Sequence, residues 1–512
     1  MLNQKLQLNT SKLAIVGYGV LIGFLTGIVV SLFRLSIEKV LAYFQTLYLA
    51  VGRGELFSLI LIILLNAGCL IVAAWLLKQN PHISGSGIPQ VEGVLTGEIT
   101  DNWWATLWRK FTAGILAIGS GLMLGREGPS IQLGAAIGQG VAKYRHLSHN
   151  KAKSLIASGA AAGLSAAFNA PLPGVMFVLE EIYHSISPFV WVGAVTGATV
   201  SDFVSTVMFG QTSVLAVGHL TVFPVKLYGL LLVFGLMLGL FGYMYQRVLL
   251  ASLSLYDKLR LPKYFYGVIP FILVLPVGLL WPHVLGGGNG LILSLNNTPT
   301  SVKLLLGLLA VRFVFSMVSY GSGLPGGIFL PILTLGALSG TLIGNVFVTL
   351  NWMPTTYILN FVVIGIAGYF ACIGKAPFTA IILVFEMVGS VTHILPLAFV
   401  SLVAYLVVDL LNSAPIYESL LARLLQQNQQ NNASSEMTTL EIPVLAGSIM
   451  EDQQIRDLNL MPNSLIKLVK RSDNLLIPKG DLVLRAGDII YLRANQDVAQ
   501  AIKRQLLATV AV

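Results

Sequence analysis

The chain has 512 residues, of which 55% are hydrophobic and only 10% are charged, and its mean hydropathy is +0.79. Soluble domains carry about a quarter charged residues, so this composition excludes an ordinary soluble protein. The formal net charge is +9, but residues 435–512 contain nine Lys/Arg and nine Asp/Glu, so the surplus belongs to the rest of the chain. Two cysteines and seven scattered histidines form no disulfide or metal-ligand pattern. We expect no metal, no other cofactor and no nucleic-acid partner.

Apolar runs of about 20 residues, the length needed to cross a bilayer, recur along the chain. In chain order the clearest are residues 13–33, 57–77, 224–250, 264–284, 301–320, 358–373 and 393–411. They predict an all-α polytopic membrane protein. A basic stretch at residues 143–153 indicates a cytoplasmic loop. We prefer this explanation of the positive charge to the alternative, a field that attracts anions.

The membrane part contains an internal repeat, found by comparing the sequence with itself. Three blocks match in the same order: residues 81–87 with 282–288, 119–138 with 321–340, and 170–180 with 376–386. The repeat predicts two halves, at about residues 12–215 and 224–425. An odd number of spans in each half would make the halves inverted, with a binding site at mid-bilayer on interrupted helices.

The end of the chain has a different composition. We expect the membrane domain to cover residues 1–425, followed by a Gln/Asn-rich polar linker at 426–439. Residues 440–512 have soluble composition and predict a small cytosolic α/β domain. Its expected strands are residues 464–470, 474–478, 481–485 and 488–493, and its expected helix is 496–507.

Four Gly/Pro breaks in the apolar sequence indicate helix starts. A helix start exposes unpaired N–H groups and a partial positive charge, so several starts aimed at one point form an anion site. Partial charges suit a passing halide, because a transported ion must also be released. The candidate groups are the hydroxyls of Ser86 and Tyr417, the N–H groups around Arg126 and Gly128, and those of Ile328 and Phe329. Ordinary kinking would explain any one break, but not all four together.

Glu127 lies inside one of these breaks, at residues 125–129, whereas the matching position in the second half is Phe329. An ionised carboxylate can itself occupy an anion site, and protonation would release it for chloride. Exchange of a proton for an anion follows from that competition. The alternative is a structural pair with Arg126, but acids within the membrane are usually functional.

Glu180 and Glu181 form a second acidic position. Glu180 matches Glu386 of the other half, which favours a structural contact at a helix end. Glu181 matches Met387, so it is the better candidate for handing protons to the site from the cytoplasm. A solvated helix end remains the alternative.

The four breaks together resemble the anion-site motifs of CLC chloride channels and transporters. The resemblance covers about residues 12–425. It implies a homodimer with one pore per subunit and about eighteen helices in inverted halves. It also implies that Ser86 and Tyr417 coordinate chloride with hydroxyls, that Ile328 and Phe329 do so with backbone N–H, and that Glu127 is the gating glutamate. A glutamate at position 181 resembles the proton-coupled exchangers of the family.

The tail resembles a TrkA-C regulatory domain, on residues 470–473, the Pro-Lys-Gly-Asp turn at 478–481 and the Gly-Asp turn at 487–488. The resemblance implies dimeric contact, a small regulatory ligand such as a cyclic dinucleotide, and a prokaryotic inner membrane as the location.

We therefore expect a chloride/proton exchanger rather than an enzyme. A passive, gated chloride channel is the alternative. An intramembrane hydrolase using Ser86 and His82 is disfavoured, because no acid orients the histidine and the matching residue of Ser86 is Gly287.

Overall fold

The computed structural model describes residues 2–183, 188–211, 220–295, 301–389, 393–431, 437–444, 448, 450–458, 460, 464–471, 474–495, 502 and 506. The chain divides into two compact units, Met1–Leu421 and Ala422–Val512. The first unit contains the membrane helices and the second contains a four-stranded sheet.

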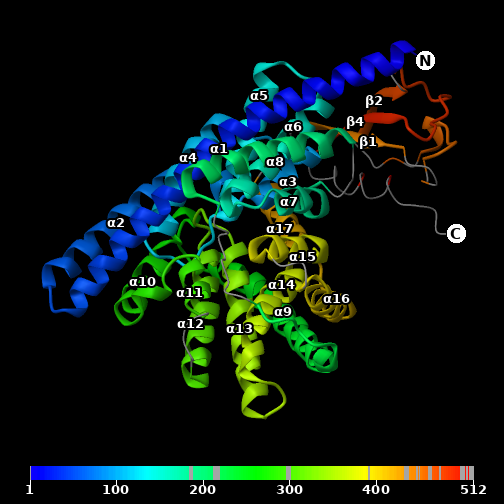
Figure 1. Ribbon diagram of the computed structural model, residues 1–512. Helices are drawn as coiled ribbons and strands as arrows, with labels where there is room; N and C mark the ends of the chain where they lie inside the picture. Colours follow the sequence, from blue (N-terminus) through cyan, green and yellow to red (C-terminus); the bar gives the residue numbers. More distant parts are fainter. Residues whose placement is uncertain are drawn as a thin grey trace. The chain divides into compact units, whose positions relative to one another are not determined.

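The helices of the first unit repeat in number and order (Figure 1). Among the described residues, the first half holds α1 (Leu2–Gly52), α2 (Leu56–Gln79), α3 (Ile88–Thr96), α4 (Trp103–Gly119), α5 (Glu127–Tyr144), α6 (His149–Phe168), α7 (Pro171–Phe177) and α8 (Pro188–Phe209). The second half holds α9 (Tyr228–Asp257), α10 (Val268–Leu280), α11 (Asn289–Ser294), α12 (Val302–Gly321), α13 (Phe329–Thr349), α14 (Ile358–Gly374), α15 (Pro377–Val388) and α16 (Ile394–Leu410). A last helix, α17 (Ile416–Asn431), follows them.

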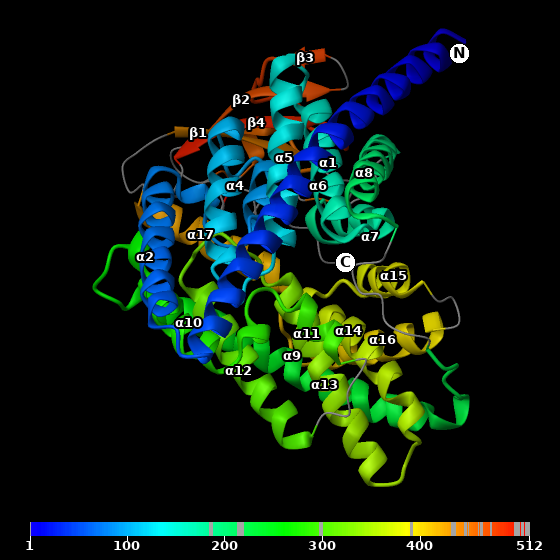
Figure 2. The same cartoon turned by 60° about the vertical axis from the view of Figure 1, so that its left-hand side comes forward.

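Equivalent helices of the two halves pack in equivalent ways. The long helix α1 lies along α4, α5, α6 and α8 (Figures 1 and 2), and its counterpart α9 lies along α12, α14 and α16. Helices α5 and α6 approach closely because a side chain at Gly134 would overlap the carbonyl of Gly159, and Gly336 and Gly365 do the same for α13 and α14. Small residues are the usual means of close helix packing in membranes. The predicted repeat architecture is therefore confirmed.

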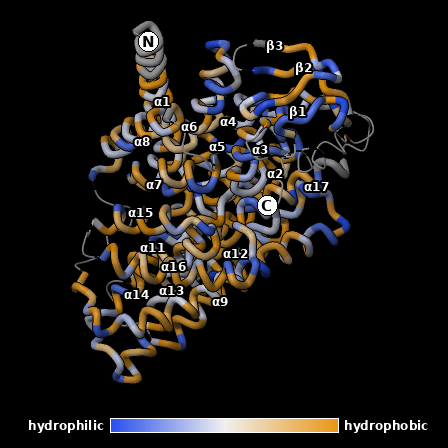
Figure 3. Tube along the Cα trace, turned by 90° about the vertical axis from the view of Figure 1, so that its right-hand side faces the viewer, coloured by the Kyte–Doolittle hydropathy of each residue, from blue (hydrophilic) through white to orange (hydrophobic). Residues whose placement is uncertain are grey.

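Eight helices among the described residues are long and apolar enough to cross a bilayer. The apolar runs predicted from the sequence all fall largely on helices, although the run 264–284 forms the shorter α10 and a 3₁₀ turn at Pro282–Val284. Apolar residues dominate the traces of α9, α13, α14 and α16 in Figure 3. Several helices are too short to span, as expected for breaks that face protein rather than lipid.

The small domain is an antiparallel sheet in the order β1-β4-β2-β3, formed by β1 (Met437–Pro443), β2 (Ser464–Arg471), β3 (Asn474–Leu476) and β4 (Ile489–Asn495). One apolar cluster supports it, including Ile442, Val469 and Leu492. Asp488 is fixed by two hydrogen bonds from Arg471, 2.8 Å from Nε and 2.7 Å from Nη2. Burial raises the pKa of Asp488, but these bonds and the N–H of Arg485 outweigh it and hold the pKa below its usual range.

One strand prediction for the tail needs correction. Residues 481–485 form no strand, since only Val483 pairs, in an isolated bridge with Gln454. Within the stretch expected to be a polar linker, 426–439, the residues up to Asn431 form the end of α17 and those from Met437 form the start of β1. Residues 432–436 and 472–473, and most of the expected helix 496–507, lie outside the described residues.

Candidate anion site

The starts of α5 and α13 meet at the centre of the first unit. The N–H of Gly125 donates to the carbonyl of Gly327 at 2.7 Å, and the N–H of Gly327 donates back to Gly125 at 2.6 Å. Gly125 and Gly327 are equivalent in the repeat, so this reciprocal antiparallel pair lies on the local two-fold axis between the halves. The two electropositive helix starts are thereby held side by side.

The start of α3 packs against the start of α5. Gly87, just before α3, has the left-handed φ of 92° that favours glycine. A Cβ placed on Gly128 would lie 2.8 Å from the carbonyl oxygen of Ser86, so Ser86 and Gly128 are direct neighbours. Ser86 is buried, and its Oγ accepts from the N–H of Ile88 at 3.1 Å. That bond uses a lone pair of the oxygen, so the hydroxyl hydrogen can turn between the nearby Tyr320 phenol and an anion.

Glu127 is fully buried at the first position of α5. Among the described residues no group makes a well-aligned hydrogen bond to its carboxylate oxygens, although the backbone N–H groups of Glu127 itself and of Leu330 point toward them. The carboxylate folds back over Gly125 toward the start of α13, where the N–H of Leu330 lies close to the same point. Arg126 is near, with 4.0 Å between its Nε and Oε1 of Glu127. A buried carboxylate placed beside free helix N–H groups is poised to occupy an anion site or to leave it.

Phe329, the counterpart of Glu127, packs in an aromatic cluster that leads to Tyr417. Its ring lies 4.4 Å from that of Phe370 and 5.6 Å from that of Phe177, between centroids, and Phe177 contacts Tyr417 edge-on at 5.8 Å. The Tyr417 hydroxyl is buried and has no hydrogen-bond partner within the described parts of the chain. It is also close enough to Glu127 and Glu181 to sense their charges.

The two neighbouring glutamates have different environments. Glu181 is buried in a π-helical turn, Val178–Ile182, a distortion that is frequent at functional sites. It packs against Gly374, next to Phe370 of the aromatic cluster. Glu180 instead accepts hydrogen bonds at the start of α15, from the N–H of Thr379 at 2.7 Å and of Phe378 at 3.2 Å. This is the structural helix-end contact expected for Glu180 from the repeat.

The sequence analysis missed two buried cations beside the site. Lys110 donates to the carbonyls of Ile83 and Gly85, at 2.8 and 2.7 Å. Its repeat equivalent, Arg312, donates to Val284 and Gly286 in the same way, at 2.9 and 2.7 Å. The signal that could have found them is the recurrence of a basic residue at one repeat position within apolar helices. Both cations thereby pair carbonyls of the turns just before α3 and α11.

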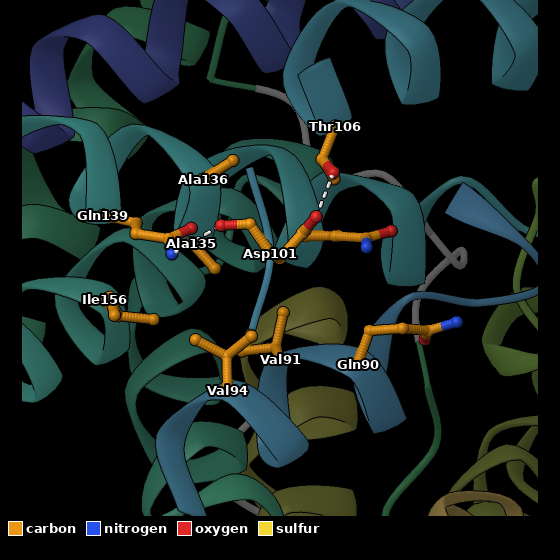
Figure 4. A pocket seen from close by; sticks show the side chains of 10 residues that line it. Gln90, Val91, Val94, Asp101, Thr106, Ala135, Ala136, Gln139 and Ile156 are labelled. Carbon is orange, nitrogen blue, oxygen red and sulfur yellow. Dashed lines mark hydrogen bonds between the residues drawn. The ribbon is translucent and has the colours of Figure 1, made fainter. Parts of the chain in front are cut away.

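Gln132 and Gln90 support the same turn, since they donate to the carbonyls of His82 and Ser84, at 2.9 and 2.8 Å. They also line a cavity of about 20 Å³, with Asp101 and Thr106 hydrogen-bonded at its edge (Figure 4). A cavity of that size has room for about one water molecule. None of the predicted site residues lines it.

Comparisons with known proteins identify the family of the chain. A model of the voltage-gated chloride channel family matches residues 68–409. The chain belongs to this family. The H(+)/Cl(−) exchange transporter ClcA of Vibrio cholerae serotype O1 (strain M66-2) is 34% identical over 443 residues, which cover 84% of this chain and 93% of that protein. A model of the TrkA-C domain matches residues 439–507, so the resemblance of the tail is also confirmed.

Solved structures of other proteins have the same fold as this family member. A slow cyanobacterial Cl−/H+ antiporter superposes with a TM-score of 0.76 at 29% identity, covering 82% of this chain and 99% of that one. A CLC-type fluoride/proton antiporter superposes with a TM-score of 0.64 at 23% identity and shows likeness of fold alone. Membership of this family, whose listed relatives are exchange transporters, argues against the hydrolase alternative.

Proposed function

We propose that this protein is a secondary exchanger that moves chloride against protons across a membrane. The single observation that carries the proposal is the buried carboxylate of Glu127 at the paired starts of α5 and α13, where only backbone N–H groups point toward it. Only a group that leaves the site when it is protonated can link the two ions there.

In the proposed site, chloride is held by dipoles and hydroxyls rather than by a full positive charge. Ser86 and Tyr417 donate their hydroxyl hydrogens, and Ile328 and Phe329 donate backbone N–H groups. On the other side of Glu127, the N–H groups around Arg126 and Gly128 form the part of the path that the carboxylate occupies when ionised. Because helix-start dipoles are weaker than a buried lysine, the ion can leave again.

The proton route in this proposal runs between two carboxylates. Glu181 takes up a proton from the cytoplasm, and the proton then reaches Glu127, which is released from the helix starts. Phe370, which lies beside Glu181, forms one buried aromatic cluster with Phe177 and with Phe329 at the start of α13. In this proposal the cluster excludes bulk water from the route. Protons therefore cross this region only when the carboxylates are in place to carry them.

A passive chloride channel is the alternative, and one experiment separates the two. The protein is reconstituted into liposomes, a chloride gradient is imposed, and the pH of the lumen is recorded. An exchanger drives protons uphill against an opposing pH gradient. Chloride flux without uphill proton movement contradicts the exchanger and supports the channel.

Three further features belong to the same proposal. The protein is a homodimer with one pathway in each subunit. It resides in a prokaryotic inner membrane, with residues 143–153 on the cytoplasmic side. Its TrkA-C domain binds a small regulatory ligand, of which a cyclic dinucleotide is one example.

A further inference from the structure

An acid outside the predicted motifs controls the charge next to Glu127. Glu38, on α1, accepts with one carboxylate oxygen from Arg126 Nη1 at 2.6 Å and from Arg34 Nε at 3.1 Å. The side chain of Glu38 is 43% exposed, whereas those of Arg34 and Arg126 are 11% and 7% exposed. Two nearly buried cations therefore share one accessible carboxylate.

The two arginines are not free to follow Glu38 if it is removed. Arg34 Nη1 donates to Asn169 Oδ1 at 2.8 Å, and its guanidinium lies 4.0 Å from the ring centroid of Phe209. Arg126 is fixed by its place directly before α5 and by its proximity to Glu127. Arg34, Arg126 and Glu38 together have a formal charge of +1. Loss of the Glu38 charge would raise this charge to +2 next to Glu127.

We infer that Glu38 is a positioning residue that sets the charge beside Glu127. Through that charge it sets the external pH at which exchange runs and the apparent affinity for external chloride. The inference rests on the proposed function and extends it to residues that lie outside the anion-site motifs.

The sign of the effect follows from the charges that face Glu127. The charged groups are Arg126, directly before α5, and the Arg34–Glu38 pair on α1. The Tyr417 hydroxyl on α17 and the backbone N–H groups of α13 face Glu127 as neutral donors. An added positive charge favours the ionised carboxylate, so protonation from outside requires a lower pH. The same charge attracts chloride.

The test is Glu38→Gln in proteoliposomes, with Glu55→Gln as the matched control. Glu55 is an exposed acid in the turn after α1, directly before α2, and it accepts a hydrogen bond from Ser58 instead of from the arginines. We expect Glu38→Gln to move the external pH profile of exchange down by about 0.5 to 1 pH unit. At a pH low enough to keep Glu127 protonated, so that its carboxylate does not compete, we also expect the KM for external chloride to fall about two- to fivefold, whereas the control changes neither value.

A second measurement keeps the test independent of folding. Glu38→Cys is made in a Cys69→Ser background, which leaves only the buried Cys372 as a native thiol. After reconstitution, a thiosulfonate reagent carrying a sulfonate should return the pH profile toward that of the unsubstituted protein. A reagent carrying a trimethylammonium group should move it further down.

The outcomes are distinct. If Glu38→Gln lowers the maximal rate but leaves the pH profile and the chloride KM in place, Glu38 is only structural and the inference is wrong. Failure of the introduced thiol to react, or equal effects of the two reagents, also overturns it. If the unsubstituted protein moves no protons uphill, the proposed function fails instead, and that result is read before any variant is tested.

Discussion

The two halves of the membrane unit share one backbone plan but differ in the side chains placed on it. Both halves have eight described helices in the same order, and both place a helix start at the central Gly125–Gly327 pair. At that start the first half carries Glu127 and the second carries Phe329. The duplicated features build the scaffold, and we propose that ion chemistry resides where the halves differ.

A second contrast lies at the turns before α3 and α11. Arg312 donates to Val284, Gly286 and also Gly287, and Thr334 donates to Gly287 as well, at 3.2 Å. In the first half Lys110 reaches only Ile83 and Gly85. In the second half, side chains thus donate to the carbonyl of Gly287, whereas no side-chain donor among the described residues reaches the equivalent carbonyl of Ser86.

The largest effect should come from Glu127→Ala. The variant has no carboxylate to compete with chloride or carry a proton, so uphill proton transport should fall to background while chloride flux continues. The measurement is paired recording of luminal pH and chloride efflux from proteoliposomes. The control is Phe329→Leu, at the equivalent position of the other half, which should retain coupling because Phe329 acts through its backbone N–H. Loss of coupling in the control, or its survival in Glu127→Ala, would contradict the assigned asymmetry.

Glu181→Val should have the next largest effect. Removing a positioned proton carrier should lower proton flux on the order of 100-fold, with chloride flux remaining measurable. Met387→Leu, at the equivalent position, should leave the number of chloride ions moved per proton unchanged. An unaltered ratio in Glu181→Val would place the proton route elsewhere.

The sequence was sufficient for the plan of the membrane unit, because Gly/Pro breaks, apolar runs and the repeat are all local patterns. The repeat also distinguished Glu180 from Glu181, and the structure explains the distinction by the cap that Glu180 forms on α15. It could not place Glu38 beside Arg126, since residues 88 positions apart meet only through the packing of α1 on α5. Nor could it predict the π turn at Glu181, which depends on tertiary packing.

Exchanging the cations of the two turns should have a smaller effect. Lys110→Arg places a longer, forked donor where Arg312 fills the other turn, so it should reach the Ser86 carbonyl and lower chloride flux by about tenfold, equivalent to about 1.4 kcal/mol. Arg312→Lys should leave chloride flux intact but lose a buried charged hydrogen bond, which costs about 1.5–3 kcal/mol of stability.

Flux assays and thermal unfolding in detergent provide the two measurements for this exchange. If both variants lose stability and neither loses flux, the turns differ only in their packing and not in their role toward the ion.

The smallest effects should come from the reciprocal helix caps that join the halves. Glu180 accepts from Phe378, Thr379 and the Thr379 hydroxyl at the start of α15, whereas Glu386 accepts from the N–H of Leu172 at the start of α7 at 3.1 Å. Removing a helix cap costs about 0.5–2 kcal/mol.

The temperature of thermal unfolding should therefore fall in both Glu180→Gln and Glu386→Gln. It should fall further in Glu180→Gln, because that substitution disturbs three hydrogen bonds. Both variants should keep the proton coupling of the unsubstituted protein, since a cap shared by both halves belongs to the scaffold. A coupling defect in Glu180→Gln as large as that of Glu181→Val would mean that both neighbouring acids carry protons, and that equivalence in the repeat does not mark a residue as structural.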